Sequence, residues 1–180
     1  MNKITIKEYE FELLLTKEKI FNRVKELASQ IDNDYANKKP ILMLTLKGAI
    51  IFAADLMREI SIPIQMETII AKSYGYKMTT EGNVELIENP IDLEGKDIII
   101  IEDIVDTGYT MSSLLTRLKE FQPNSIEICT LLFKPKNLVV PIKVKYIGFE
   151  IDPLFVVGYG LDYAELGRNY KDIYVKVDKN

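Results

Sequence analysis

The feature that most constrains this chain is an uninterrupted apolar run that leads directly into carboxylates. Residues 98–101 are four consecutive isoleucines, followed by Glu102, Asp103 and, three residues later, Asp106. Because the run does not alternate apolar and polar residues, it is typical of a strand buried on both faces, as in a parallel sheet covered by helices. Ligands of such sheets bind beyond the carboxyl ends of the strands. The run therefore predicts an α/β fold, with a strand that stops at the acidic pair and polar chemistry at that edge of the sheet.

A turn of small and polar residues follows the carboxylates. It consists of Thr107, Gly108, Tyr109 and Thr110, and residues 111–121 after it carry apolar side chains at helical spacing. A small-residue turn at a helix start binds anions, because its backbone N–H groups point at the ligand. The two threonine hydroxyls add further donors. The sequence thus predicts a phosphate site, beside acidic groups that suit sugar hydroxyls or a divalent cation such as Mg²⁺.

Length and composition set the broad class. The chain has 180 residues, of which 47% are hydrophobic and 28% charged, as expected for one globular domain with a real core. Its net charge of -4 argues against nucleic acid as the main partner. Charged residues punctuate positions 1–20, and no apolar run approaches the roughly 18 residues of a membrane span. We therefore expect a cytosolic protein that binds neither nucleic acid nor membrane.

Two scarce residue types narrow the chemistry. Cys129 is the only cysteine, so an internal disulfide is impossible, and its apolar surroundings predict core packing. The chain has no histidine. Proton transfer must therefore use a carboxylate, lysine, tyrosine or water, and any bound metal is expected to be a hard ion held by oxygen.

The rest of the chain is typical of alternating strands and helices. Residues 3–15 predict a strand or hairpin, and Thr16 is placed to cap a helix that runs to about residue 35. Further elements are expected as a strand over 41–46, a helix over 49–60, a strand over 64–71, and strands at 98, 126 and 144 that complete a core sheet of four or five. Residues 72–95 are too many for a simple connection inside a compact domain, so we expect them to form a lid or a flexible hairpin. The alternative is a disordered segment without a function. The tail from residue 149 predicts a cap over the sheet edge.

The central motif closely resembles the phosphoribosyl-diphosphate (PRPP) binding motif of the purine phosphoribosyltransferases. That motif is an apolar strand, Glu-Asp, two apolar residues and Asp-Thr-Gly-x-Thr, and residues 98–110 match it at every defining position. Similarity to the hypoxanthine(-guanine) phosphoribosyltransferase family extends over residues 41–168. It implies a type I phosphoribosyltransferase-like fold, in which helices flank a central, mainly parallel sheet. The chain is then one domain over 1–180, with a core at about 16–148 and a small hood from 1–15 and 149–180.

The resemblance also implies a role for separate groups of residues. The 5′-phosphate is expected on Asp106, Thr107, Gly108, Tyr109 and Thr110. Residues 44–49 resemble the pyrophosphate loop, whose peptide before the lysine is often cis, so pyrophosphate is expected on Lys47, Gly48 and Arg168. The lid motif corresponds to Ser73 and Tyr74. The purine is expected on Ile104, Lys134, Phe155, Val156 and Asp162, and Mg²⁺ on Glu102 and Asp103, with Asp162 approaching a second ion through water.

Each of these segments also has a simpler reading. Without the resemblance, residues 44–49 are typical of an ordinary strand-to-helix turn, Lys134 of a solvated lysine, Phe155 of a core residue and Tyr74 of a surface residue. The chain departs from the family at Gly167, where an aromatic is usual, and over residues 170–180. Arg168 lies between these two departures, so its pyrophosphate role is the one that they affect.

The implied reaction transfers the phosphoribosyl group from PRPP to N9 of hypoxanthine or guanine, with Asp106 as the catalytic residue that handles the proton at N7. The family resemblance also implies a homo-oligomer, a dimer or tetramer. Two alternatives remain from the sequence. A non-catalytic regulator on the same fold would only sense PRPP or a nucleotide. A receiver-type phosphoacceptor domain also places an acidic pair after a strand, but it has no use for Asp-Thr-Gly-x-Thr.

Overall fold

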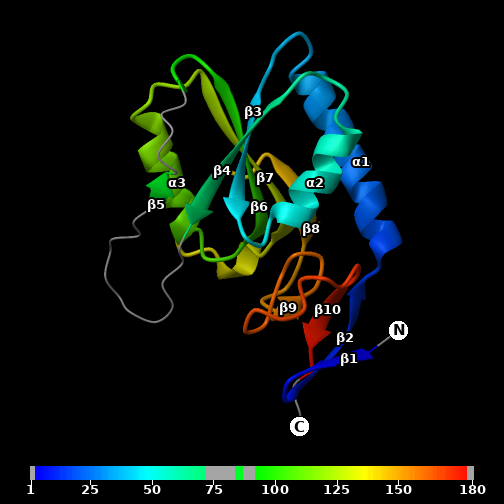
Figure 1. The fold of residues 1–180 in the computed structure, drawn as a ribbon. Coiled ribbons are helices and arrows are strands. Elements are labelled where there is room, and N and C mark those ends of the chain that lie inside the picture. The colour runs from blue at the N-terminus through cyan, green and yellow to red at the C-terminus, as the bar shows by residue number, and fades with distance from the viewer. Residues whose placement is uncertain (1–2, 72–83, 87–91, 178–180) are drawn as a thin grey trace.

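The strands of the chain form two separate sheets (Figure 1). The structure is a computed structural model that describes residues 3–71, 84–86 and 92–177. The larger sheet has the order β5-β4-β3-β6-β7-β8, and the smaller has the order β1-β2-β10-β9. The strands are β1 (Lys3–Ile6), β2 (Tyr9–Leu15), β3 (Ile41–Leu46), β4 (Gln65–Ala71), β5 (Val84–Leu86), β6 (Asp97–Val105), β7 (Ser125–Phe133), β8 (Tyr146–Glu150), β9 (Val156–Val157) and β10 (Ile173–Lys176). The helices are α1 (Lys17–Asp34), α2 (Ile50–Glu59), α3 (Tyr109–Lys119) and the short 3₁₀ helix η1 (Pro135–Asn137).

The larger sheet is parallel from β4 to β8. β3 pairs in parallel with both β4 and β6, and β7 pairs in parallel with both β6 and β8. β5 pairs antiparallel with β4, so the described sheet has one strand more than the four or five expected. β5 falls within the segment predicted as a lid or hairpin, and residues 72–83 and 87–91 of that segment lie outside the described residues. Helices flank the parallel strands, as the sequence predicts.

The four isoleucines of β6 explain why the sequence shows no alternation. Ile99 and Ile101 pack into the cluster beneath α1 and α2, whereas Ile98 and Ile100 pack into the cluster beneath α3. All four side chains are completely buried. Because helices cover both faces of the sheet (Figure 1), every position of the strand favours an apolar residue.

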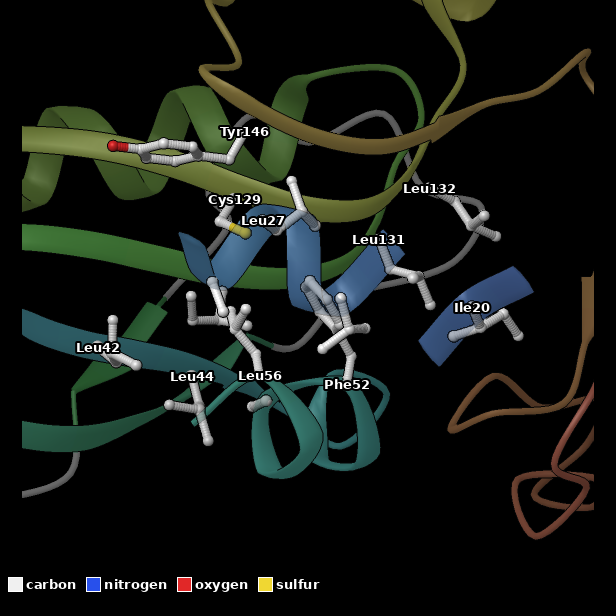
Figure 2. Packing of buried hydrophobic residues seen from close by; sticks show 14 of the residues in the cluster. Ile20, Leu27, Leu42, Leu44, Phe52, Leu56, Cys129, Leu131, Leu132 and Tyr146 are labelled. Atoms are coloured by element: carbon white, nitrogen blue, oxygen red, sulfur yellow. The ribbon is translucent and has the colours of Figure 1, made fainter. Parts of the chain in front are cut away.

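Helix α1 forms as its sequence predicts. The hydroxyl of Thr16 accepts a hydrogen bond from the backbone N–H of Lys19 at the helix start, which satisfies one of the free donors there. Figure 2 shows the apolar side chains of α1 and α2 packed around strand residues of the sheet. Cys129 lies among them and is fully buried, which raises the pKa of its thiol. Its prediction as a core residue is confirmed.

The smaller sheet joins the two ends of the chain. β2 pairs antiparallel with β1 and with β10, and β10 pairs with β9. The arrowhead of β3 points down toward the end of the molecule that holds this sheet in Figure 1, so the carboxyl edge of the larger sheet lies on that side. The tail therefore supplies strands to a second sheet, while the division of the chain into core and hood stays a prediction. No described helix is both long and apolar enough to cross a membrane.

Candidate active site

A cleft of about 830 Å³ lies at the carboxyl edge of the larger sheet and collects most of the residues that the sequence singles out. It is lined by Thr45, Leu46, Lys47, Gly48, Glu102, Asp103, Ile104, Val105, Asp106, Thr107, Gly108, Thr110, Met111, Asp162, Glu165 and Arg168. A second cavity of about 440 Å³ lies between α1, α2 and the segment around Tyr159 and Tyr170. It contains neither the acidic pair nor the phosphate loop, so the larger cleft is the candidate site.

The acidic pair lies inside β6 rather than beyond its end. The expectation that the strand stops at Glu102 is wrong, because β6 continues to pair with β7 as far as Val105. On its other side, pairing with β3 ends at Ile101. Glu102 and Asp103 therefore lie where β6 extends past its neighbour, at the floor of the cleft. Burial and the adjacent carboxyl group of Asp103 raise the pKa of Glu102 well above its usual range.

The turn after β3 passes directly over this pair. The peptide between Leu46 and Lys47 is cis, as the resemblance implies. Gly48 follows, and a Cβ atom added there would overlap the carboxylate of Asp103. The backbone can approach the acidic pair this closely only because residue 48 has no side chain.

The phosphate loop turns sharply into α3. Gly108 is the residue before the helix and has φ of 87°, in the left-handed region that favours glycine. The carbonyl oxygen of Thr107 accepts hydrogen bonds from the backbone N–H groups of Val139 and Val140, at 3.0 and 3.1 Å. Gly108 and Thr110 line the cleft, so the start of α3, where a helix has free N–H groups that suit a phosphate, lies at the cleft. Tyr109 begins the helix, with its side chain exposed.

Asp106 is hydrogen-bonded through both carboxylate oxygens. The Nζ atom of Lys134 lies 2.8 Å from Oδ2 of Asp106, and the Nδ2 atom of Asn137 lies 2.9 Å from Oδ1. The side chain of Lys134 is only 10% exposed, so it is not the solvated lysine of the simpler reading. The two residues follow β7, and neither lines the cleft itself. The contact between Asn137 and Asp106 is not predicted by any pattern in the sequence.

The opposite side of the cleft is made of ion pairs between two loops. Lys47 Nζ lies 3.2 Å from Oε2 of Glu165, and Arg168 lies 2.7 Å from Oδ1 of Asp162 and 3.4 Å from Glu165. The carboxylate of Glu165 therefore contacts both cations that are expected to bind pyrophosphate. Asp162 also accepts the backbone N–H of Glu165 through Oδ2, so both of its oxygens stabilise this loop.

The predicted base-stacking residue, Phe155, lies directly before β9 of the smaller sheet. The ring of Phe155 contacts those of Phe11 and Tyr163, with centroid separations of 6.4 and 5.9 Å. Its side chain remains 48% exposed, so it is not a core residue. Val156 is buried in β9. Neither residue lines the cleft, whereas Ile104 does.

Comparisons with known proteins agree on one family. The model of the phosphoribosyl transferase domain matches residues 12–164. A hypoxanthine phosphoribosyltransferase of Haemophilus influenzae is 38% identical over 168 residues, which cover 91% of this chain and 94% of that protein. The crystal structure of a hypoxanthine-guanine phosphoribosyltransferase from Bacillus anthracis superposes with a TM-score of 0.86 at 38% identity, covering 92% of this chain and 98% of that one. A hypoxanthine phosphoribosyl transferase of Trypanosoma cruzi gives 0.86 at 33% identity, covering 97% and 95%.

The chain belongs to the phosphoribosyltransferase family.

Membership of this family confirms the type I phosphoribosyltransferase fold and an enzyme of the transferase class. The two alternatives from the sequence are not favoured, because the family model and the relatives that match are phosphoribosyltransferases. Gly167, where the chain departs from the family pattern, has φ of 100°, which an aromatic residue rarely adopts. Arg168 nevertheless lines the cleft beside it.

Within this phosphoribosyltransferase, the predicted residues separate into three sets. The metal, 5′-phosphate and pyrophosphate residues line one cleft, apart from Tyr109, which is not among its lining residues. The purine residues Lys134, Phe155 and Val156 lie outside that lining. Ser73 and Tyr74 lie outside the described residues. The sequence analysis missed two charged or polar residues of the site: Glu165, which lines the cleft, and Asn137, which contacts Asp106.

Proposed function

We propose that this enzyme transfers the 5-phosphoribosyl group of PRPP to N9 of hypoxanthine or guanine, giving the nucleoside monophosphate and pyrophosphate. The observation that carries the proposal is one cleft that combines an acidic pair, a phosphate loop at a helix start and two cations from other loops. A sugar with a phosphate at one end and a diphosphate at the other matches that combination. The names of the relatives support the purine as acceptor.

In this proposal the two anionic ends of PRPP bind to different parts of the cleft. The 5′-phosphate binds residues 106–110, where backbone N–H groups and threonine hydroxyls donate. The pyrophosphate binds Lys47, the backbone of Gly48 and Arg168. A guanidinium group suits this role because its planar donors match two phosphate oxygens at once.

Glu102 and Asp103 are suited to hold Mg²⁺. Among residues 3–71, 84–86 and 92–177, no group of three or more acidic, histidine or cysteine side chains is placed to hold a metal. A cation here would therefore complete its shell with water and substrate oxygens, as Mg²⁺ does in phosphate-transfer sites. A bound cation would also offset the proximity of the two carboxylates that raises the pKa of Glu102. When bound, Mg²⁺ neutralises charge on the departing pyrophosphate. We assign Asp162 a water-mediated approach to a second ion.

The base is proposed to lie between Phe155 on one side and Ile104 on the other, with Val156 adjoining. Lys134 donates to the oxygen at position six of the purine. An ammonium group has three N–H donors, so the contact with Asp106 leaves two for the base. As the N9–C1′ bond forms and the bond from C1′ to pyrophosphate breaks, Asp106 accepts the proton that leaves N7.

Three further parts of the proposal concern the lid residues, the cellular location and the oligomeric state. Ser73 and Tyr74 close over the reacting sugar and exclude water. The enzyme is a cytosolic homo-oligomer, a dimer or tetramer. The work on the Trypanosoma cruzi relative concerns the effect of its C-terminal region on oligomeric state and activity, which supports testing the mass in solution by light scattering.

The function is tested by incubating the protein with Mg²⁺, PRPP and, separately, hypoxanthine, guanine, xanthine and adenine, and measuring nucleotide by chromatography. We expect product with hypoxanthine or guanine and little with adenine, since Lys134 would face an amino donor there. Omitting Mg²⁺ should abolish the reaction. PRPP binding without nucleotide from any base would instead indicate the non-catalytic sensor.

A further inference from the structure

The segment after β7 holds the chain on both sides of Asp106. The backbone N–H of Lys134 donates to the carbonyl oxygen of Val105 at 2.9 Å. Val139 and Val140 donate to the carbonyl oxygen of Thr107. The residues before and after Asp106 are thus fixed by the backbone of one short segment, residues 134–140.

Within this segment, two side chains hold the carboxylate itself. Lys134 donates to one oxygen of Asp106 and Asn137 donates to the other. Asn137 is brought into position by η1, in which its own N–H donates to the carbonyl oxygen of Lys134 at 3.0 Å. Each carboxylate oxygen has two acceptor sites, so one site on each oxygen remains for a substrate proton.

The two donors differ in what else they are suited to do. The Lys134 ammonium lies on a flexible stem and is, in the proposed function, shared with the purine. The Asn137 amide lies on a short, half-buried side chain and carries no charge. It can therefore hold the carboxylate without adding a positive charge that would weaken Asp106 as a base. Because Lys134 is shared with the purine, the amide is the donor that serves the carboxylate alone.

We propose that Asn137 is a positioning residue that fixes the orientation of the Asp106 carboxylate for proton transfer. The proposal rests on the proposed function, in which Asp106 accepts the proton of the base. A misplaced base loses catalytic rate rather than substrate affinity, because the geometry of the reacting groups matters most in the transition state.

The chain contains a matched control at the opposite end of β6. There, Nδ2 of Asn124 donates to Oδ1 of Asp97 at 2.7 Å, so the same pair of groups meets far from the cleft. Asn124→Ala and Asn137→Ala each remove one amide donor from one carboxylate. Only the second removal changes the proposed catalytic base.

The experiment measures kcat, KM for PRPP and thermal stability of the parent, Asn137→Ala and Asn124→Ala with hypoxanthine. We expect Asn137→Ala to lower kcat by about 10- to 150-fold, the range for a hydrogen bond to a charged group, with KM for PRPP within twofold. Asn124→Ala should keep kcat within twofold of the parent, even if its melting temperature falls as far as that of Asn137→Ala. A kcat of Asn137→Ala within threefold of the parent would overturn the proposal.

A second variant covers the case in which Asn137→Ala does not fold. Asn137→Asp keeps the shape of the side chain but replaces the donor with a second carboxylate beside Asp106, and we expect kcat below that of Asn137→Ala. Parental kcat in Asn137→Asp contradicts the positioning role. If the parent itself forms no nucleotide, the proposed function fails and the role of Asn137 fails with it, whereas an active parent with unaffected variants overturns the Asn137 proposal alone.

Discussion

One wall of the cleft, from Glu102 to Thr110, is continuous with the core, and the facing wall, formed by Lys47 and residues 162–168, is joined by ion pairs. The first wall follows four fully buried isoleucines and is hydrogen-bonded to residues 134–140. In the second, the side chains of Lys47 and Glu165 are 70% and 68% exposed. Exposed pairs of this kind contribute about 0–1 kcal/mol, so they can exchange partners when an anion arrives.

Because the two walls are held in different ways, we infer that they have different roles in the reaction. The groups that must keep a fixed geometry during bond formation, Asp106 and Lys134, are held by the core. Lys47, which must release one anion and bind another, is held by an exposed ion pair that is easily replaced. Changes to the first wall should therefore affect kcat, and changes to the second should affect substrate affinity.

The largest effect is expected from Asp106→Asn. Removing the proton acceptor should lower kcat by about 10²–10⁴ while PRPP still binds, the usual contribution of a positioned acid or base. Asp97→Asn, at the other end of β6, is the control, with activity expressed per mole of folded protein. Steady-state kinetics with hypoxanthine measure both, and activity of Asp106→Asn within threefold of the parent would remove Asp106 from the mechanism.

The second prediction concerns Lys134→Met. Loss of the donor should cost hypoxanthine about 1.5–3 kcal/mol of transition-state binding, the range for a hydrogen bond to a charged group, so its preference over adenine narrows by roughly 10- to 150-fold. Both activities also fall because Asp106 loses a partner, so the ratio is the informative quantity.

Lys136→Met is the matched control for Lys134→Met. Lys136 is two residues away and pairs with Asp152 outside the cleft, and its removal should leave the ratio unchanged. If Lys134→Met lowers hypoxanthine and adenine activity by the same factor, Lys134 supports Asp106 but does not recognise the base.

The smallest of the three effects is expected on the second wall. Glu165→Gln removes the carboxylate that pairs with Lys47 and, at longer distance, with Arg168, so KM for PRPP should fall by up to about fivefold. Glu120→Gln removes a comparable exposed pair with Arg117 and should leave KM unchanged. A rise in KM for Glu165→Gln would mean that the carboxylate organises the wall rather than competing with PRPP.

The sequence predicted the parts of this site that are local along the chain. The isoleucine run, the acidic pair and the turn at residues 107–110 carry their signal within a dozen positions, because burial on both faces and a helix start each leave a short pattern. The contact between Asn137 and Asp106 spans 31 positions, and that between Lys47 and Glu165 spans 118. Such contacts depend on how separate elements approach, which no local pattern records.

The end of β6 is a second feature that the local sequence does not determine. The change from apolar to acidic residues predicted that the strand stops at Glu102, yet the strand continues to Val105. Pairing with β7 decides where it ends, and the sequence of β6 alone does not contain that partner. The departure at Gly167 is likewise explained only by a backbone angle.

If Glu102 and Asp103 hold a cation for PRPP, Glu102→Gln should have two opposite effects: it should stabilise the protein without metal and remove the stabilisation that Mg²⁺ and PRPP give. The folded protein raises the pKa of Glu102 above its usual value of 4.5, so between these two values the folded state binds more protons than the unfolded state, and stability falls as pH rises. At pH 7 without metal, Glu102→Gln removes the loss of stability that ionisation of Glu102 causes, so the variant should melt at a higher temperature than the parent. Well below pH 4.5 Glu102 is protonated in both states, and the difference in melting temperature should vanish.

The most direct measurement is therefore the melting temperature of the parent and Glu102→Gln at pH 7, with EDTA and then with Mg²⁺ and PRPP. PRPP at about 100 times its Kd should add about 2.7 kcal/mol to the free energy of unfolding of the parent, which raises its melting temperature by several degrees for a chain of this size. Glu102→Gln should start higher and rise little, so the order of the two proteins narrows or reverses on adding ligand. A variant that starts no higher than the parent and shows the full Mg²⁺-dependent rise would contradict the account.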